Sequence, residues 1–180
     1  MSLKTLVLGM ALFATPALSG GVLEDFNRNP QDRWAYFADT VMGGVSSGGV
    51  EYKRDAQVSF ARLSGTVSTD NNGGFIQIRV RLSAAPPENT QGIRLIVRGN
   101  NQPYYIHLRT RGTRLPWQYY QAEFATTGTW SEVKIPLSEF KPSDGLLRKT
   151  LKSSSLRTLG IVAYGRDHLA EVDVSEIAFY

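Results

Sequence analysis

Alternation of apolar and polar residues constrains the fold of this chain more than any other feature of its sequence. Residues 75–82 read Phe-Ile-Gln-Ile-Arg-Val-Arg-Leu, so every second side chain from Ile76 onward is apolar. Residues 92–99 and 104–109 alternate in the same way, with one exception at Ile96. A period of two is typical of a β-strand with one buried face, because successive side chains point to opposite sides. The pattern predicts a protein built from sheets.

Turn-forming residues divide the chain into about eleven such segments. Besides the three above, we expect strands near residues 22–26, 34–37, 50–54, 58–67, 119–126, 130–135, 158–164 and 171–179. Short strands at this spacing predict an all-β, antiparallel β-sandwich of the jelly-roll type. Only Leu146–Leu151 is expected to be helical, and the last strand is expected to pair near the first.

The N-terminal residues have the pattern of a signal peptide. Lys4 precedes an apolar run from Thr5 to Ala14, and Ala17-Leu18-Ser19 offers small residues to a signal peptidase. The apolar run is about 10 residues long, about half of what a bilayer core requires. We expect a signal peptide at 1–19, with an uncleaved anchor as the alternative, and a single jelly-roll domain at 20–180. The protein is then secreted across the inner membrane into the periplasm.

Thiol chemistry and serine hydrolysis are disfavoured by the sequence. The chain contains no cysteine, which excludes disulfides, thiol catalysis and thiolate metal sites. Residues 44–48 match the G-x-S-x-G pattern of serine hydrolases around Ser46, but the next residues read as a strand where that motif needs a helix. We expect no catalytic residue, and a hydrolase that uses Ser46 is the least favoured of three functional hypotheses.

Metal binding has little support. The two histidines, His107 and His168, lie far apart in sequence and do not form a recognisable zinc motif. Asp70–Gly73 resembles a calcium loop but lacks the downstream glutamate, so a hairpin turn is favoured there. We expect no metal and no cofactor, although a structural calcium that uses Asp25 or Asp173 stays open.

Arginine is concentrated in one part of the chain. Residues 79–114 hold seven arginines and one acid, Glu88, for a net charge of +6. Beyond residue 19 the chain has 20 − 1 = 19 Lys and Arg, since Lys4 is removed, against 16 acids, for a net charge of +3. The residues beyond position 19 that lie outside 79–114 therefore have a net charge of 3 − 6 = −3. Guanidinium groups bind carboxylates and phosphates through paired hydrogen bonds, so this region is a candidate anion-binding surface.

Alternation assigns the polar side chains of three consecutive strands to solvent. If these strands are neighbours in one sheet, a basic and partly aromatic surface forms from Arg79, Arg94, Arg98, Tyr105, His107 and Arg109. Tyr119, Gln121 and Glu123 would extend it, and Trp117 is a candidate for an exposed stacking residue. An anionic polysaccharide, a lipid headgroup or an acidic protein surface would fit, whereas nucleic acid does not fit an exported protein. The alternative is a solvated sheet face whose arginines pair with acids elsewhere.

Two glycine-rich segments carry a family resemblance. Residues 39–46 read Asp-Thr-Val-Met-Gly-Gly-Val-Ser, and residues 71–75 read Asn-Asn-Gly-Gly-Phe. Together they resemble the signature of the NADH:ubiquinone oxidoreductase intermediate-associated protein 30 family, and the resemblance implies a galactose-binding-like jelly roll. The positions that match are Asp39, Met42, Gly43, Gly44, Ser46, Asn72, Gly73 and Gly74. They are candidates either for a binding site or for a structural loop pair tied by Asp39 and Asn72.

The resemblance also implies a function. Mitochondrial members of that family are assembly factors for respiratory complex I and are not enzymes. This bacterial, secreted member is then a non-enzymatic binding or accessory domain whose partner is a protein of the cell envelope, such as a membrane complex under assembly. Mitochondrial relatives face the matrix, whereas a secreted protein faces the periplasm, so contact would be limited to the outer ends of membrane subunits. Peripheral membrane contact and the oligomeric state stay open. The alternative function is a carbohydrate-binding module for an acidic glycan.

Overall fold

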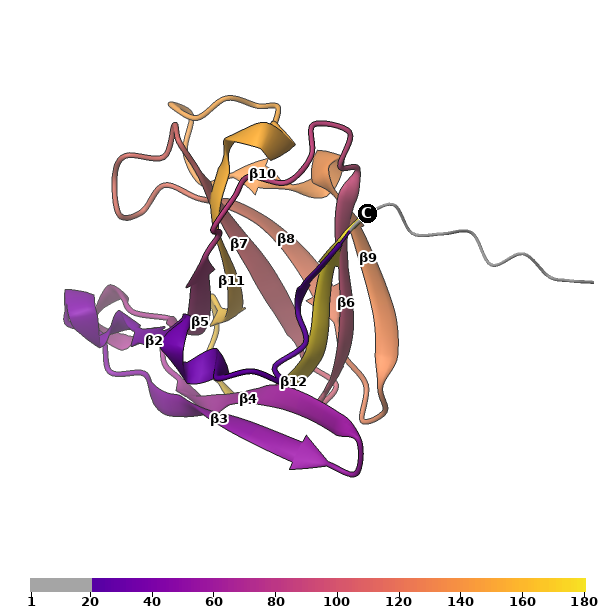
Figure 1. Ribbon diagram of the computed structural model, residues 1–180. Helices are drawn as coiled ribbons and strands as arrows, with labels where there is room; N and C mark the ends of the chain where they lie inside the picture. The colour runs from indigo at the N-terminus through magenta and orange to yellow at the C-terminus, as the bar shows by residue number, and fades with distance from the viewer. Residues whose placement is uncertain (1–20) are drawn as a thin grey trace, which may run out of the picture.

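A computed structural model describes residues 21–180, which form two antiparallel sheets packed face to face (Figure 1). Sheet A has the strand order β3-β4-β12-β6-β9, with β1 also pairing with β12, and sheet B has the order β10-β8-β7-β11-β5-β2. The strands are β1 (Val22–Glu24), β2 (Trp34–Ala38), β3 (Ser47–Asp55), β4 (Val58–Val67), β5 (Phe75–Arg81), β6 (Gly92–Gly99), β7 (Pro103–Thr110), β8 (Tyr120–Ala125), β9 (Ser131–Pro136), β10 (Lys141–Pro142), β11 (Leu156–Tyr164) and β12 (His168–Phe179). The expected signal peptide, residues 1–19, lies outside the described residues.

The predicted all-β sandwich is confirmed. Each of the eleven expected strands is present, and β10 is an additional short one. The first strand pairs with the last, as expected, with Val22 opposite Ala178. The connections contain only short 3₁₀ turns: η1 (Pro30–Asp32), η2 (Asp39–Met42), η3 (Asp70–Asn72), η4 (Leu137–Glu139) and η5 (Ser153–Ser155). None of the helices within residues 21–180 is long and apolar enough to cross a membrane.

Two local expectations were wrong. The segment Leu146–Leu151 forms turns instead of a helix, and the Asp144 carboxylate accepts hydrogen bonds from the N–H groups of Leu146 and Leu147 at 2.9 and 3.2 Å. Leu147 and Leu151 are both buried, which mimics helical spacing, but six residues are too few to nucleate a stable helix. The turn at Asp70–Asn72 joins β4 of sheet A to β5 of sheet B, so it is a crossover and not a hairpin.

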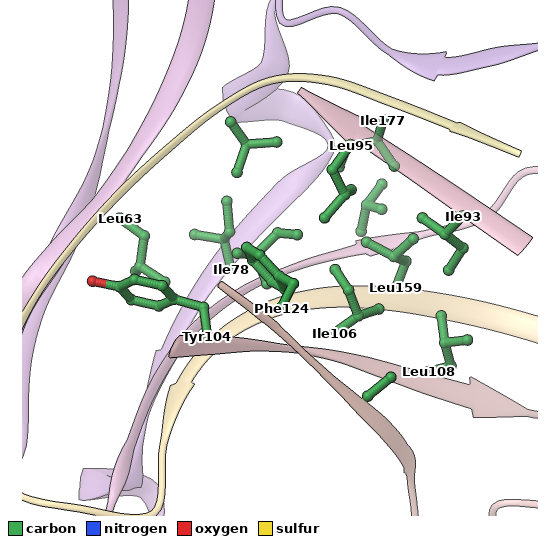
Figure 2. Packing of buried hydrophobic residues seen from close by; sticks show 14 of the residues in the cluster. Leu63, Ile78, Ile93, Leu95, Tyr104, Ile106, Leu108, Phe124, Leu159 and Ile177 are labelled. Atoms are coloured by element: carbon green, nitrogen blue, oxygen red, sulfur yellow. The ribbon is translucent and has the colours of Figure 1, made fainter. Parts of the chain in front are cut away.

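The core lies between the sheets and is built from the side chains that alternation assigned to the inside. Figure 2 shows Ile78, Ile106 and Leu159 of sheet B beside Leu95 and Ile177 of sheet A. All five are fully buried. Burial of each such side chain stabilises the folded state by roughly 1.5–3 kcal/mol relative to exposure of that side chain to water. This free energy favours packing of the two sheets against each other.

Tyr104 is a fully buried core tyrosine. Its hydroxyl donates to Asn100 Oδ1 at 2.6 Å and accepts from the N–H of Glu171 at 2.8 Å. Burial raises the pKa of Tyr104 to about 12, so the hydroxyl stays neutral. A buried hydroxyl with both partners satisfied costs little and fixes the position of the ring. The β6–β7 turn is thereby tied to β12 of sheet A.

A buried carboxylate, that of Asp39, ties the two sheets together at one edge. Asp39 follows β2 of sheet B and has no exposed surface. Its Oδ2 accepts hydrogen bonds from the Ser46 hydroxyl and the Gly74 N–H, both at 2.5 Å, and its Oδ1 accepts from the Ser46 N–H at 2.9 Å. Ser46 Oγ also accepts from the N–H of Ser68, just after β4 of sheet A, at 3.0 Å. We call this network, with the Phe75 N–H, the Asp39 knot.

The glycines around the carboxylate have a steric reason. A Cβ atom on Gly44 would lie closer than 3.0 Å to Asp39 Cγ, and a Cβ on Gly73 would lie closer than 3.0 Å to Asp39 Oδ2. Real Cβ atoms do not tolerate such contacts, so only glycine lets the backbone close around the carboxylate. The two glycine motifs of the sequence are therefore the two walls of one buried cage.

The cage keeps its carboxylate ionised. Burial by itself raises the pKa of Asp39, but the hydrogen bonds from Gly74, Ser46 and Phe75 outweigh this effect and hold the pKa below its ordinary value of 3.8. Hydrogen bonds to a charged acceptor are about twice as strong as those between neutral groups. The charge is thus stabilised by N–H and O–H donors instead of a cation.

Adding a methyl group to the cage should destabilise the protein. We expect Gly44→Ala to lower the free energy of unfolding by about 1–3 kcal/mol, because the new Cβ must push Asp39 away from its donors. Gly49→Ala is the matched control, since Gly49 lies in the adjoining β3 with open space around its Cβ position. It should change stability by less than about 0.5 kcal/mol. Urea unfolding measures both, and equal values would contradict the steric account.

The charge of Asp39 should be visible in the pH dependence of stability. Because its pKa is lower in the folded state, its contribution is present above pH 3.8 and is lost as the pH falls through the folded pKa. We expect Asp39→Asn to cost about 2–4 kcal/mol at neutral pH. The difference between wild type and variant should shrink below pH 3.8. Urea unfolding between about pH 2 and 6 tests this, and a constant difference would show that the charge is irrelevant.

Candidate functional site

The glycine-loop residues are mostly structural. Asp39 and Ser46 are buried, and Gly44, Gly73 and Gly74 enclose or bond the carboxylate. The Ser46 hydroxyl is bonded to Asp39 and Ser68 and is only 2 % exposed, so it is not placed as a nucleophile.

Three further motif residues lie outside the Asp39 knot. Gly43 adopts φ of +90° at the end of η2, a conformation that suits glycine. Asn72 is exposed and makes none of the hydrogen bonds of the knot, so the expectation that it ties the loops was wrong. Met42 is 62 % exposed and forms an apolar tip with Val41 and Val45. The motif thus encloses Asp39 and Ser46, and it leaves Met42, Gly43 and Asn72 accessible.

The predicted basic surface is divided between the two sheets. Arg79 lies on β5 and Arg109 on β7, both in sheet B, whereas Arg94 and Arg98 lie on β6 in sheet A. The condition for a single basic surface, that the three strands are neighbours in one sheet, is therefore not met. The reason is that residues 82–91 cross from sheet B to sheet A, so strands consecutive in sequence are separated in space.

The arginines on the outer face of sheet A are neutralised. Arg94 is bonded to Glu176 and also pairs with Glu132 at 3.3 Å. Arg98 and Arg62 share the buried carboxylate of Asp173, with Nε···O distances of 2.8 and 2.7 Å. These pairs confirm, for sheet A only, the alternative of a solvated face with paired charges. Asp173 thus has both oxygens occupied by arginine, which removes it as a candidate calcium ligand.

The outer face of sheet B brings together the other predicted residues. In the register of the sheet, Gly160 of β11 lies between Arg79 on β5 and His107 on β7. One step along, Thr158 lies between Arg81 and Arg109. Gly160 has no side chain, and the Gln77 side chain fills this space, with its Oε1 3.1 Å from where a Cβ on Gly160 would lie.

Aromatic side chains cover one half of this face. The His107 ring stacks on Tyr119, with 4.0 Å between ring centroids and 10° between planes. Tyr164 meets the edges of His107 and Tyr105 at 5.5 and 5.9 Å, and the Tyr119 hydroxyl donates to that of Tyr164 at 3.2 Å. The Tyr105 hydroxyl donates to Glu123 at 2.7 Å. We call Tyr105, His107, Tyr119 and Tyr164 the aromatic cluster.

His107 carries no charge at neutral pH. Burial lowers the pKa of His107 from 6.5 to about 3, because the ring is covered by its aromatic neighbours. Its Nε2 and the Oε1 of the adjacent Gln121 are buried without hydrogen-bond partners among residues 21–180. The positive charge of this face therefore comes from arginine alone and does not change between about pH 5 and 8.

Arginine side chains line the other half, around a hollow of about 480 Å³. Six arginines and three threonines line it together with Ala35 and Phe37, and no acidic side chain does. The arginines are Arg33, Arg79, Arg81, Arg109, Arg111 and Arg157. Arg33 pairs with Glu24 at 2.6 Å, whereas the other five have no carboxylate partner within residues 21–180. We call this feature the arginine hollow.

Several arginines are held in place at an electrostatic cost. The Arg79 guanidinium lies 4.4 Å from the centroid of the Phe37 ring, and Arg109 donates to the carbonyl oxygen of Leu115 at 2.8 Å. Burial, and then repulsion from Arg109 and Arg81, lower the pKa of Arg79. The group stays protonated, because the ordinary pKa of arginine is above about 12. The hollow thus has a strongly positive potential.

Sequence reasoning missed several residues of this face, among them Arg33, Phe37, Arg157 and Tyr164. They come from β2, β11 and their flanks, which pair with β5 and β7 only in the folded sheet. The alternation of Arg33, Ala35 and Phe37 against buried Trp34 was the available signal, but it does not say which strand lies next to which. Trp117 is 60 % exposed, as expected, in the loop tied to Arg109 through Leu115.

Residues 21–180 contain no cluster of three or more His, Asp or Glu side chains that could hold a metal ion. The other residue considered for calcium, Asp25, accepts a hydrogen bond from the N–H of Asn27 at 3.0 Å. The outer face of sheet B offers guanidinium groups, aromatic rings and hydroxyls.

Comparison with solved structures supports the sandwich. The family 11 carbohydrate-binding module from Clostridium thermocellum, solved with a β-1,3-1,4-mixed-linked tetrasaccharide, matches with a TM-score of 0.72 at 14% identity, covering 89% of this chain and 94% of that one. The family 11 module of the cellulase Lic26A-Cel5E of Clostridium thermocellum gives 0.73 at 14% identity, covering 91% and 95%. The family 30 module of the cellulase Cel9D-Cel44B of Clostridium thermocellum gives 0.51 at 13% identity, covering 76% and 91%. At these identities the likeness shows the fold alone.

Sequence comparison identifies the family. No curated protein matched the chain. The profile of one family, described as Complex I intermediate-associated protein 30, matches residues 24–171, a span that includes both walls of the Asp39 knot and the outer face of sheet B. The resemblance carried by the two glycine motifs is thereby confirmed, and the chain belongs to the Complex I intermediate-associated protein 30 (CIA30) family.

Proposed function

We propose that this protein is a non-catalytic periplasmic accessory domain that binds a protein partner during assembly of a membrane complex. Membership of the Complex I intermediate-associated protein 30 family supports the assembly role. The signal-peptide pattern of residues 1–19 supports the periplasmic location. The enclosed Ser46 hydroxyl supports a binding role over hydrolysis.

The observation that carries the proposal is the difference between the two outer faces. Sheet A presents arginines already paired with Glu132, Glu176 and Asp173. Sheet B presents the aromatic cluster and the five unpaired arginines of the hollow, with exposed Trp117 at the margin. Tyrosine, tryptophan and arginine are the residues enriched at the centres of protein interfaces. The outer face of sheet B is therefore the partner-binding surface in this proposal.

A photo-crosslinking amino acid at position 117 should capture the partner. We expect irradiation of intact envelopes to yield a defined adduct with a subunit of a membrane complex, because Trp117 is 60 % exposed beside the proposed surface. The control carries the same crosslinker at position 169, since Leu169 is 71 % exposed on β12 of sheet A. Mass spectrometry of the adducts is the measurement. Equal yields from both positions, or no adduct from position 117, would contradict the proposal.

The second candidate function is binding of an acidic glycan. It is supported by the adjacency of the aromatic cluster and the arginine hollow on one face, since sugar rings stack on aromatic side chains and arginine binds carboxylates. The fold shared with carbohydrate-binding modules adds only an analogy.

Affinity electrophoresis separates this candidate from the first. If the glycan hypothesis holds, gels containing polygalacturonate should retard the protein and gels containing a neutral β-glucan should not. Trp117→Ala should weaken the retardation about three- to tenfold, because the loss of one aromatic contact costs about 0.5–1.5 kcal/mol of binding free energy. Leu169→Ala, in sheet A, should leave it unchanged. Migration unaffected by polygalacturonate would eliminate the glycan as ligand.

A further inference from the structure

The arginine hollow concentrates positive charge without a counter-charge. Arg79, Arg81, Arg109, Arg111 and Arg157 converge on one space of about 480 Å³ with no acidic side chain in its lining. On the outer face of sheet A, by contrast, Arg62, Arg94 and Arg98 are paired with carboxylates, as at Asp173 and Glu176. Like charges held together oppose folding, so sequences seldom retain them unless a ligand offsets the repulsion.

The donors of the hollow are fixed before any ligand arrives. Phe37 supports the guanidinium plane of Arg79, and the carbonyl of Leu115 holds Arg109. Thr158 lies between Arg81 and Arg109 in the register of the sheet, and its buried hydroxyl has no hydrogen-bond partner among residues 21–180. A buried polar group without a partner is costly, so an acceptor bound beside Thr158 would be stabilised. Such preorganisation reduces the entropy lost on binding.

The available donors select a particular ligand chemistry. Guanidinium groups offer only N–H donors, in a fork that matches the two oxygens of a carboxylate or phosphate. Five unpaired cations exceed what one singly charged group can neutralise. The volume lies within the range of about 300–1,000 Å³ that is usual for small-molecule sites.

We propose that the arginine hollow is a binding site for a small, multiply charged oxoanion, one that bears phosphate groups or clustered carboxylates. The site goes beyond the partner-binding role proposed above and does not depend on it. Arg79 and Arg81 on β5 and Arg109 on β7 provide paired N–H donors, and the hydroxyl of Thr158, which lies between these strands, provides an O–H donor.

Titration of the purified protein with pyrophosphate and with citrate tests the proposal. Calorimetry at low ionic strength should show saturable binding, and a saturating probe should raise the thermal midpoint by about 5 °C. Arg81→Gln with Arg109→Gln should lower the affinity at least tenfold. The same double variant should melt at the same or a higher temperature without ligand, because repulsion in the hollow is relieved. A merely structural role for the arginines predicts a lower midpoint instead.

Arg54→Gln is the matched control. Arg54 is exposed on β3 of sheet A and makes no ion pair within residues 21–180, so its loss removes one charge without touching the hollow. It should change the affinity less than twofold. Tighter binding of pyrophosphate identifies a phosphate-bearing ligand, and tighter binding of citrate identifies a carboxylate-bearing one.

Two results would overturn the proposal. The first is the absence of saturable binding of either probe beyond that of sodium chloride at equal ionic strength. The second is an equal loss of affinity in Arg54→Gln and in the double variant, which would show unspecific attraction. Neither result bears on crosslinking from position 117, so failure of the anion site and failure of the partner-binding role are distinguishable.

Discussion

The closure of the sandwich depends on one buried negative charge that has no cation beside it. The Asp39 carboxylate is satisfied by donors that precede β3 in sheet A and begin β5 in sheet B, so it joins the two layers at a single point. Removing a carboxylate from water is costly, and only close approach of several N–H and O–H groups offsets that cost. Close approach in turn requires glycine at positions 44 and 73. A motif that resembles a ligand loop therefore stabilises the junction of the two sheets.

The sequence predicted which side of a strand each residue occupies, but not which strands are neighbours. Period-two alternation correctly placed Ile78, Leu95 and Ile106 in the core. It contains no information on whether the chain crosses from one sheet to the other, as it does at Asp70–Asn72 and at residues 82–91. The segment Leu146–Leu151 likewise could not be assigned from its sequence. Leu147 and Leu151 are buried four positions apart, a spacing that both a helix and this turn can produce.

The site was harder to predict than the fold because charge pairing is non-local. Arg62 and Arg98 find their carboxylate on Asp173, 111 and 75 residues away in sequence. Arg157 and Arg33 reach the arginine hollow from opposite ends of the chain. A count of charges between residues 79 and 114 identified an excess of arginine, but only the three-dimensional structure separates the neutralised arginines from the free ones.

The position of β12 has a consequence for the order in which the molecule can form. This strand is the last of the sandwich in sequence, yet it lies inside sheet A, between β4 and β6. A ribosome releases the chain N-terminus first, so β4 and β6 wait without their shared neighbour until residues 168–179 have been synthesised. Contacts between residues this distant in sequence form slowly. The complete sandwich can therefore form only after β12 has been synthesised.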